Sequence, residues 1–189
     1  VLIKTGNDMK KLLLSLLLVA IICASNLRAQ TATGNNTLTM GIPAIALLAT
    51  TTDVTLELTT TTAGEAISGG QGTAYVQISS IVASGLTRKI TATVTGVPTG
   101  TALSVSAVAP SGGNSGGTLG TGETAVSLVN SDPAVDIVTG IGSCFTGVSA
   151  TDGYTLTYDW DSGAVGDYGT IVEVAAGTAT VVLTITEDQ

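Results

Sequence analysis

Histidine is absent from this 189-residue chain, and cysteine, aromatic and basic residues are scarce. Without histidine, a serine–histidine–aspartate or cysteine–histidine nucleophile system is excluded, and so is a zinc site with histidine ligands. The two cysteines, Cys23 and Cys144, are too few for a thiolate metal cluster. A pair of carboxylates is the remaining acid–base arrangement, and we expect a protein that is not an enzyme.

Positive charge is also rare in most of the chain. Four of the six basic residues lie within the first 29 positions, which leaves Arg88 and Lys89 in the sequence "TRKI". Residues 30–189 therefore carry two basic and thirteen acidic residues, a formal net charge of −11. Binding to nucleic acid or anionic lipid depends on Lys and Arg contacts, so neither is an expected partner.

The first 29 residues have the pattern of a secretory signal peptide. Lys10 and Lys11 precede the apolar run "LLLSLLLVAIICA" at residues 12–24, and "SNLRAQ" follows. The run is shorter than the ~20 residues that span a bilayer, so we expect no membrane span in the mature chain. Cleavage after Ala29 would release a secreted protein that is extracellular or at the cell surface. Residues 1–8 lie upstream of Met9, the expected start.

Cysteine supports the same assignment of the leader. Cys23 allows a lipoprotein signal, but Ile22 is bulky where such signals have a small residue. After cleavage Cys144 is the remaining cysteine, so no disulfide can form within the mature chain. We expect Cys144 to be a small buried side chain, with pairing between molecules as the alternative.

The body of the chain is rich in threonine, valine and glycine, and its apolar residues alternate with polar ones. Such alternation is typical of strands with one wet face, and it occurs at residues 54–59, 89–95, 103–107, 156–161 and 179–186. Turn sequences such as "VPTG", "SGGNSGG" and "NSDP" separate these segments. The pattern predicts an all-β fold: an antiparallel Ig-like β-sandwich of roughly eight or nine strands over residues 50–189, preceded by an N-terminal arm at 30–49.

The arm contains an apolar segment, "TLTMGIPAIALLA" at residues 37–49, that Pro43 interrupts. Two structures are open. Residues 37–42 and 45–49 could form an edge strand and its continuation in the molecule's own sandwich, because proline belongs at an edge or a break. Alternatively, the arm could add as a donor strand to the sheet of another copy. The candidate donor side chains are Leu38, Met40, Ile42, Ile45, Leu47 and Leu48.

The signal peptide, the single predicted β-sandwich and the terminal strand "GTATVVLTITEDQ" together resemble subunits of bacterial fimbriae and related secreted surface filaments. The resemblance covers most of residues 30–189 and is one of pattern. The chain departs from the chaperone–usher group because it lacks a pair of mature cysteines and an aromatic C-terminal ending. The resemblance implies a homopolymer of subunits that join by β-strand addition.

Two further groups of residues are candidate sites. Asp159, Asp161 and Asp167 in "TYDWDSGAVGDY" are weak candidates for a calcium site, since carboxylates near a glycine-rich turn suit this ion, although the loop lacks an EF-hand glutamate. No other cofactor or metal is expected. Tyr158, Trp160 and Tyr168 are candidates for an exposed platform that stacks on sugar rings, with core packing as the alternative for Trp160.

From these observations we expect a non-catalytic structural subunit of an extracellular filament, pilus-like fibre or surface layer, with copies of itself as its partners. The alternative is a monomeric secreted adhesin or carbohydrate-binding β-sandwich that binds a surface glycan through the aromatic residues or the glycine-rich loop at 111–122.

Overall fold

The computed structural model describes residues 6–25, 33–111, 114–174 and 177–188. The chain divides into two compact units, Val1–Gly41 and Ile42–Gln189. In the first unit, the apolar run at residues 12–24 lies within the helix α1 (Gly6–Ser25), and the leucines at 12–14 and 16–18 are exposed to solvent. Among the described residues, no helix has both the length and the apolar character needed to cross a membrane.

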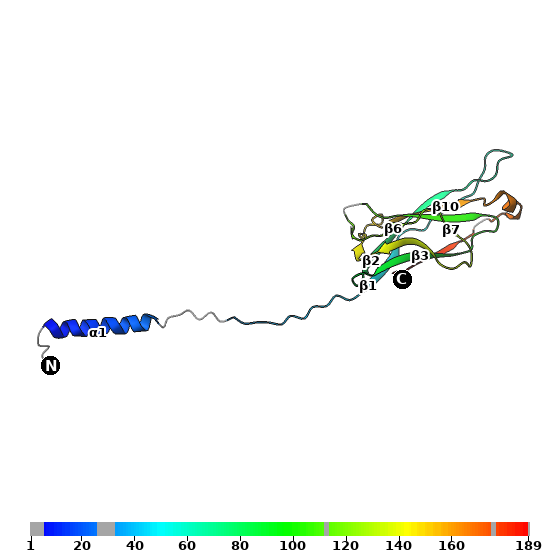
Figure 1. Ribbon diagram of the computed structural model, residues 1–189. Coiled ribbons are helices and arrows are strands. Elements are labelled where there is room, and N and C mark those ends of the chain that lie inside the picture. The colour runs from blue at the N-terminus through cyan, green and yellow to red at the C-terminus, as the bar shows by residue number, and fades with distance from the viewer. Residues whose placement is uncertain (1–5, 26–32, 112–113, 175–176, 189) are drawn as a thin grey trace. The chain divides into compact units, whose positions relative to one another are not determined.

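The second unit is built from two antiparallel β-sheets (Figure 1). The first sheet has the order β5-β9-β2-β10-β4-β7, with β1 paired to β2, and the second has the order β11-β3-β8-β6. The strands are β1 (Ile45–Thr50), β2 (Gln71–Ile81), β3 (Thr87–Thr95), β4 (Ala102–Val108), β5 (Gly116–Gly117), β6 (Thr121–Gly122), β7 (Val126–Leu128), β8 (Val135–Ile141), β9 (Cys144–Phe145), β10 (Tyr154–Asp161) and β11 (Thr180–Asp188). A short 3₁₀ helix, η1 (Val165–Thr170), follows β10.

The predicted all-β sandwich is confirmed. Three of the described strands, β5, β6 and β9, are two residues long. The remaining eight agree with the expected eight or nine. Four of the alternating segments form β3, β4, β10 and β11, in which the apolar positions face the space between the sheets and most of the polar positions between them are less buried.

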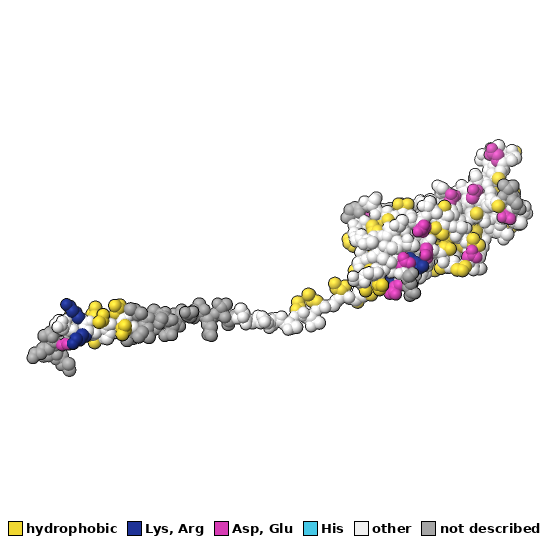
Figure 2. Space-filling model, viewed as in Figure 1, with side chains coloured by type: hydrophobic (Ala, Val, Ile, Leu, Met, Phe, Trp, Pro, Cys, Tyr) yellow, Lys and Arg dark blue, Asp and Glu magenta, His cyan; other side chains and the backbone are white. Residues whose placement is uncertain are grey.

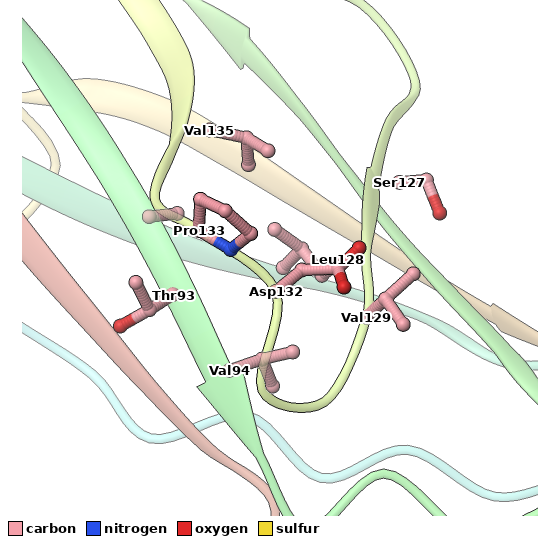
Figure 3. Close-up of a pocket in the computed structure, with 9 residues that line it drawn as sticks. Thr93, Val94, Ser127, Leu128, Val129, Asp132, Pro133 and Val135 are labelled. Carbon is pink, nitrogen blue, oxygen red and sulfur yellow. The ribbon is translucent and has the colours of Figure 1, made fainter.

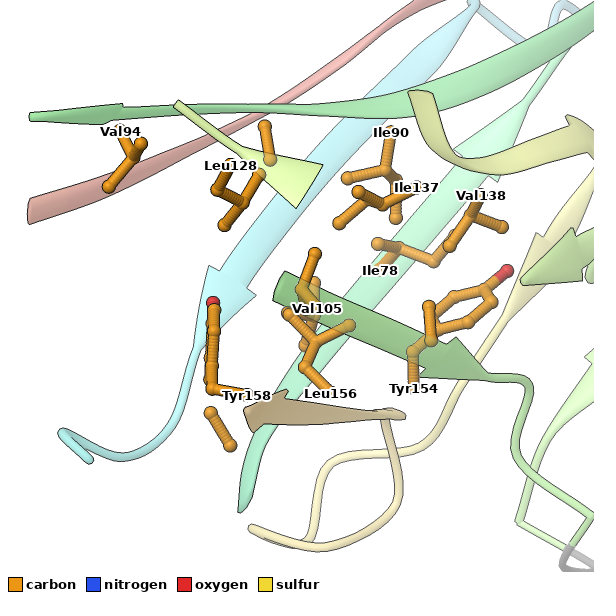
Figure 4. Close-up of a cluster of buried hydrophobic side chains, with 14 of the residues drawn as sticks. Ile78, Ile90, Val94, Val105, Leu128, Ile137, Val138, Tyr154, Leu156 and Tyr158 are labelled. Atoms are coloured by element: carbon orange, nitrogen blue, oxygen red, sulfur yellow. The ribbon is translucent and has the colours of Figure 1, made fainter. Parts of the chain in front are cut away.

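The hydrophobic core lies between the sheets and takes side chains from both (Figure 4). Its largest fully buried members are Tyr154, Ile90, Ile137, Ile141, Leu156, Val76, Val105 and Val138. Cys144 is buried beside them, and burial raises the pKa of its thiol. A buried, protonated thiol is a small hydrophobe, which is the form expected from the sequence.

Two parts of the first sheet differ from the sequence pattern. The longest strand, β2, lies outside the five alternating segments, because its inward positions include Ala74 and Ser80 besides larger apolar residues. Residues 54–58 alternate in burial as predicted but form no regular strand. There the side chains of Val54 and Leu56 pack closely on Gly72, where a Cβ would lie 2.1 Å from Val54 Cγ1. Side-chain packing replaces the backbone ladder in this segment.

The second unit, Ile42–Gln189, is here called the β-body. Its two basic residues have different environments at the start of β3. Lys89 Nζ lies 3.1 Å from Asp136 Oδ2 on the partly exposed outer face. Arg88 points inward and is 8% exposed, and its Nε has no hydrogen-bond partner. Across the turn at 82–86, the buried Ser80 hydroxyl also lacks a partner. Among the residues that the structure describes, two buried polar side-chain atoms therefore lack a hydrogen-bond partner at this end of the core.

We expect the substitution Arg88→Met to raise the free energy of unfolding by about 1 kcal/mol or more, because a buried charge costs desolvation energy when no ion pair offsets it, and none is formed by Arg88 among the described residues. Urea unfolding followed by circular dichroism measures the change. The control Lys89→Met removes an ion pair that is partly exposed, and it should lower stability by at most about 1 kcal/mol. A loss of stability in Arg88→Met as large as that of a core truncation would contradict this account of Arg88.

Candidate interaction surface

The apolar segment of the arm divides at Pro43 into two parts with different structures. Residues 37–42, here called the leading segment, form no regular secondary structure. Leu38, Met40 and Ile42 are 77%, 83% and 82% exposed. In an extended chain, residues two apart share a face, so these side chains form an apolar row opposite Thr37 and Thr39. Figure 2 shows hydrophobic side chains along this part of the chain and acidic ones on the β-body.

After Pro43 the chain enters the first sheet as β1. This strand pairs with β2 of the same molecule in an antiparallel register that runs from Ile45↔Ile81 to Thr50↔Val76. Of the candidate donor side chains, Leu48 packs against the core, Ile45 is partly buried and Leu47 is 63% exposed. The second half of the predicted donor segment is therefore paired within its own chain, whereas the leading segment is not.

Each sheet ends in a strand that has a backbone partner on one side. Two such strands are β1, which pairs with β2 in the first sheet, and β11, which pairs with β3 in the second, while the shorter strands β5, β6 and β7 also end a sheet. Cα atoms of β1 and β11 lie within 8 Å of one another, so the two edges border the same side of the sandwich. No ladder joins these two described strands. Among the described residues no further strand pairs with the outer edge of β1 or β11, so their outward backbone N–H and C=O groups can take another strand.

The three aromatic candidates do not share an exposed face. Tyr158 is a core residue with 9% exposure, and burial raises the pKa of its phenol. Trp160 packs partly against the core and its Nε1 donates to Thr101 Oγ1 at 2.9 Å. Tyr168 lies on η1 and is 39% exposed, and its hydroxyl accepts a hydrogen bond from the Ile67 backbone N–H. Core packing, the alternative stated for Trp160, describes Trp160 and Tyr158, whereas Tyr168 lies apart from them on η1.

The three acidic candidates are all exposed and have separate surroundings. Asp159 Oδ2 accepts from Gln71 Nε2 at 3.2 Å, and Asp161 Oδ1 accepts from the Ser162 backbone N–H at 2.7 Å. Asp167 lies on η1. Among the described residues there is no group of three or more Cys, Asp and Glu side chains placed to hold a metal ion.

Two hollows at the surface of the described β-body lie near candidate residues or loops. One lies between β3, β7 and the loop at 131–135, next to Val94, Leu128 and Pro133, and it has no room for a water molecule (Figure 3). The other, of about 230 Å³, lies beside the glycine-rich loop and has a polar lining that includes Asn114 and Asp152.

The polar hollow is structured by Asp152. Its carboxylate accepts hydrogen bonds from Asn114 Nδ2 and from the Ser149 backbone N–H. These bonds, that from Ser149 first, lower the pKa of Asp152. The carboxylate thus organises the surrounding loops. The sequence pattern does not point to this role, because an isolated aspartate in "SATDG" has the signature of a turn.

Comparisons with models of known protein families, with curated proteins and with solved structures find no match for this chain. The candidate surface is therefore described by its own chemistry: an exposed apolar row on the leading segment, and two strand edges with free backbone groups on the β-body.

Proposed function

We propose that this protein is a non-catalytic structural subunit of an extracellular filament, pilus-like fibre or surface layer, and that its copies join by β-strand addition. The observation that carries the proposal is the leading segment, which presents Leu38, Met40 and Ile42 to solvent at a strand-like spacing. An exposed apolar row of this kind is unfavourable in water. Burial of apolar surface is worth about 25 cal/mol of free energy per Å², which favours contact of this row with a partner surface.

The other properties of residues 30–189 fit an assembly of identical subunits. Thirteen acidic and two basic residues disfavour nucleic acid and anionic lipid as partners. Small Thr, Ser, Gly and Ala side chains lose little entropy when two surfaces pack. The secretory leader and the resemblance to fimbrial subunits support an extracellular location.

A monomeric glycan-binding module has less support. Such a module needs aromatic rings with free faces and polar tips. Tyr158 is buried, and the Trp160 indole N–H already donates to Thr101. The polar hollow at Asp152 has no aromatic residue in its lining.

The proposal predicts that the triple substitution Leu38→Ser, Met40→Ser and Ile42→Ser abolishes self-assembly of a chain that begins at Gln30. The change removes the apolar row, while β1 and the core retain their residues. Sedimentation velocity and negative-stain electron microscopy measure the size and shape of the particles. The parent chain should form polymers, and the triple variant should sediment as a monomer.

A matched control replaces Thr37 and Thr39, on the opposite face, with serine, and this variant should polymerise like the parent. Circular dichroism should give the same β-sheet spectrum for all three proteins. Two results would contradict the proposal: a parent chain that stays monomeric at high concentration, or a triple variant that polymerises as readily as its control.

A further inference from the structure

We propose that the acceptor for the leading segment is the free edge of β11 in a second copy of the chain. This inference rests on the proposed function and specifies which surface of the partner is used. It follows from three properties of β11: the exposure of its inward side chains, the regularity of its edge, and the match between its apolar spacing and that of the leading segment.

The inward side chains of β11 are less buried than the residues they pair with on β3. Val94, Ala92 and Ile90 on β3 are 3%, 1% and 1% exposed. Their partners on β11 are Val181, Leu183 and Ile185 in the same order, and these three pack against the core but are only partly buried. The inward side chains of this strand pair are therefore buried on β3 and partly exposed on β11. One more strand beside β11 would cover them.

The edge of β11 lacks the features by which proteins usually protect an exposed strand. Edge strands are commonly short, bulged or interrupted by proline, or they carry lysine. The pairing of β11 with β3 is regular over nine rungs, from Thr180↔Thr95 to Asp188↔Thr87. Residues 180–186 contain no charged residue and no proline, and the acidic Glu187 and Asp188 follow only at the end. Among the described strands that end a sheet, β11 is also the longest.

The leading segment has the complementary pattern. Its apolar residues recur at every second position, as do Val181, Leu183 and Ile185 on β11. If the segment pairs with β11 as a strand, its apolar row lies beside the three half-buried residues and its threonines face solvent with Thr184 and Thr186. Backbone hydrogen bonds along the edge supply affinity, and the apolar rows set which face turns inward.

The connection to β1 excludes one partner within the segment's own chain. Two residues, Pro43 and Ala44, separate Ile42 from Ile45. A two-residue hairpin requires a positive φ at its first central position, whereas proline is fixed near −65°. The segment therefore cannot fold back tightly along β1, and the proposal places it on the β11 edge of a second copy.

Photo-crosslinking within the assembled polymer tests the acceptor. The chain from Gln30 with Met40→benzoylphenylalanine is mixed with an excess of ¹⁵N-labelled chain that lacks the probe, and the mixture is irradiated and digested for mass spectrometry. We expect ¹⁵N-labelled adducts within residues 180–186. Labelled adducts in β1, or adducts confined to the probe's own chain, would overturn the assignment to β11. Strand addition itself is tested separately by the serine variants described above.

A pair of charge variants gives a second readout. Thr184 is exposed on the free edge, and Thr73 is exposed on β2, which has a neighbouring strand. We expect Thr184→Lys to raise the protein concentration needed for polymerisation about tenfold or more, because a lysine on an edge opposes strand addition, while Thr73→Lys adds the same charge with little effect. Equal behaviour of these two variants would overturn the role of β11. Failure of every variant, the parent included, to polymerise would instead overturn the proposed function.

Discussion

Replacing Tyr154 with alanine should lower the free energy of unfolding by about 3–5 kcal/mol, as is typical when a large aromatic core residue is removed. Tyr154 is fully buried on β10, opposite Val76 of β2, and is among the largest side chains of the core (Figure 4). Its hydroxyl donates to the backbone carbonyl of Leu119, so the ring also connects β10 to the glycine-rich loop. A loss of this size is a large share of the ~5–15 kcal/mol that stabilises a typical domain.

Urea unfolding followed by the fluorescence of Trp160 measures the effect. The substitution Tyr154→Phe keeps the ring and removes only the hydrogen bond to Leu119, so it should cost about 1–2 kcal/mol. The control Leu47→Ala truncates an apolar side chain that is 63% exposed and should change stability by less than about 0.5 kcal/mol. If Tyr154→Ala and Leu47→Ala cost the same, the core is not centred on the space between the two sheets.

The second large effect is expected from Gly69→Ala, which should destabilise the fold by about 2–4 kcal/mol. An ideal Cβ at Gly69 would lie 1.4 Å from the backbone carbonyl oxygen of Trp160. Because that atom belongs to the backbone of β10, it cannot move aside as a side chain could, and strain or displacement of the strand must follow. The neighbouring hydrogen bond from the Trp160 N–H to the Gly70 carbonyl, 3.3 Å long, should be lost with it.

Thermal unfolding and the emission maximum of Trp160 report on this change, since Trp160 is the single tryptophan. The matched control is Gly169→Ala, because Gly169 has open space where its Cβ would lie and does not require a positive φ. This variant should stay within about 0.5 kcal/mol of the parent. Equal stability of Gly69→Ala and Gly169→Ala would show that the chain at Gly69 does not approach β10 this closely.

Much of the fold could be predicted from local pattern. In β3, β4, β10 and β11 the alternation of apolar and polar residues is regular, and all four segments are strands. The pattern was less informative for β2, whose inward row includes Ala74 and Ser80, because small and polar residues do not signal a core position. At residues 54–58 the alternation predicted burial correctly but not the backbone conformation. That conformation depends on how closely the side chains of Val54 and Leu56 can approach β2 at Gly72.

The candidate sites depended more on tertiary contacts. Tyr158 and Trp160 share a face with Leu156 in the sequence pattern, and the sandwich turns that face inward, so the rings are not free for a ligand. The three aspartates lie within nine residues of one another, yet Asp159 and Asp161 lie on β10 with different hydrogen-bond partners and Asp167 lies on η1. Closeness along a chain gives a metal site only when the backbone brings the carboxylates together.

The sequence by itself determined which catalytic and metal-binding side chains are missing from the chain and the kind of secondary structure it forms. The absence of histidine, the scarcity of Lys and Arg, and the recurrence of apolar residues at every second position can be interpreted from the sequence without knowing any tertiary contact. Only the tertiary structure decided which half of the apolar segment has a partner in its own chain and which sheet edge is left open. The reason is that backbone pairing is a long-range choice: every strand offers the same N–H and C=O groups, and the packing of the whole sandwich selects which of them meet.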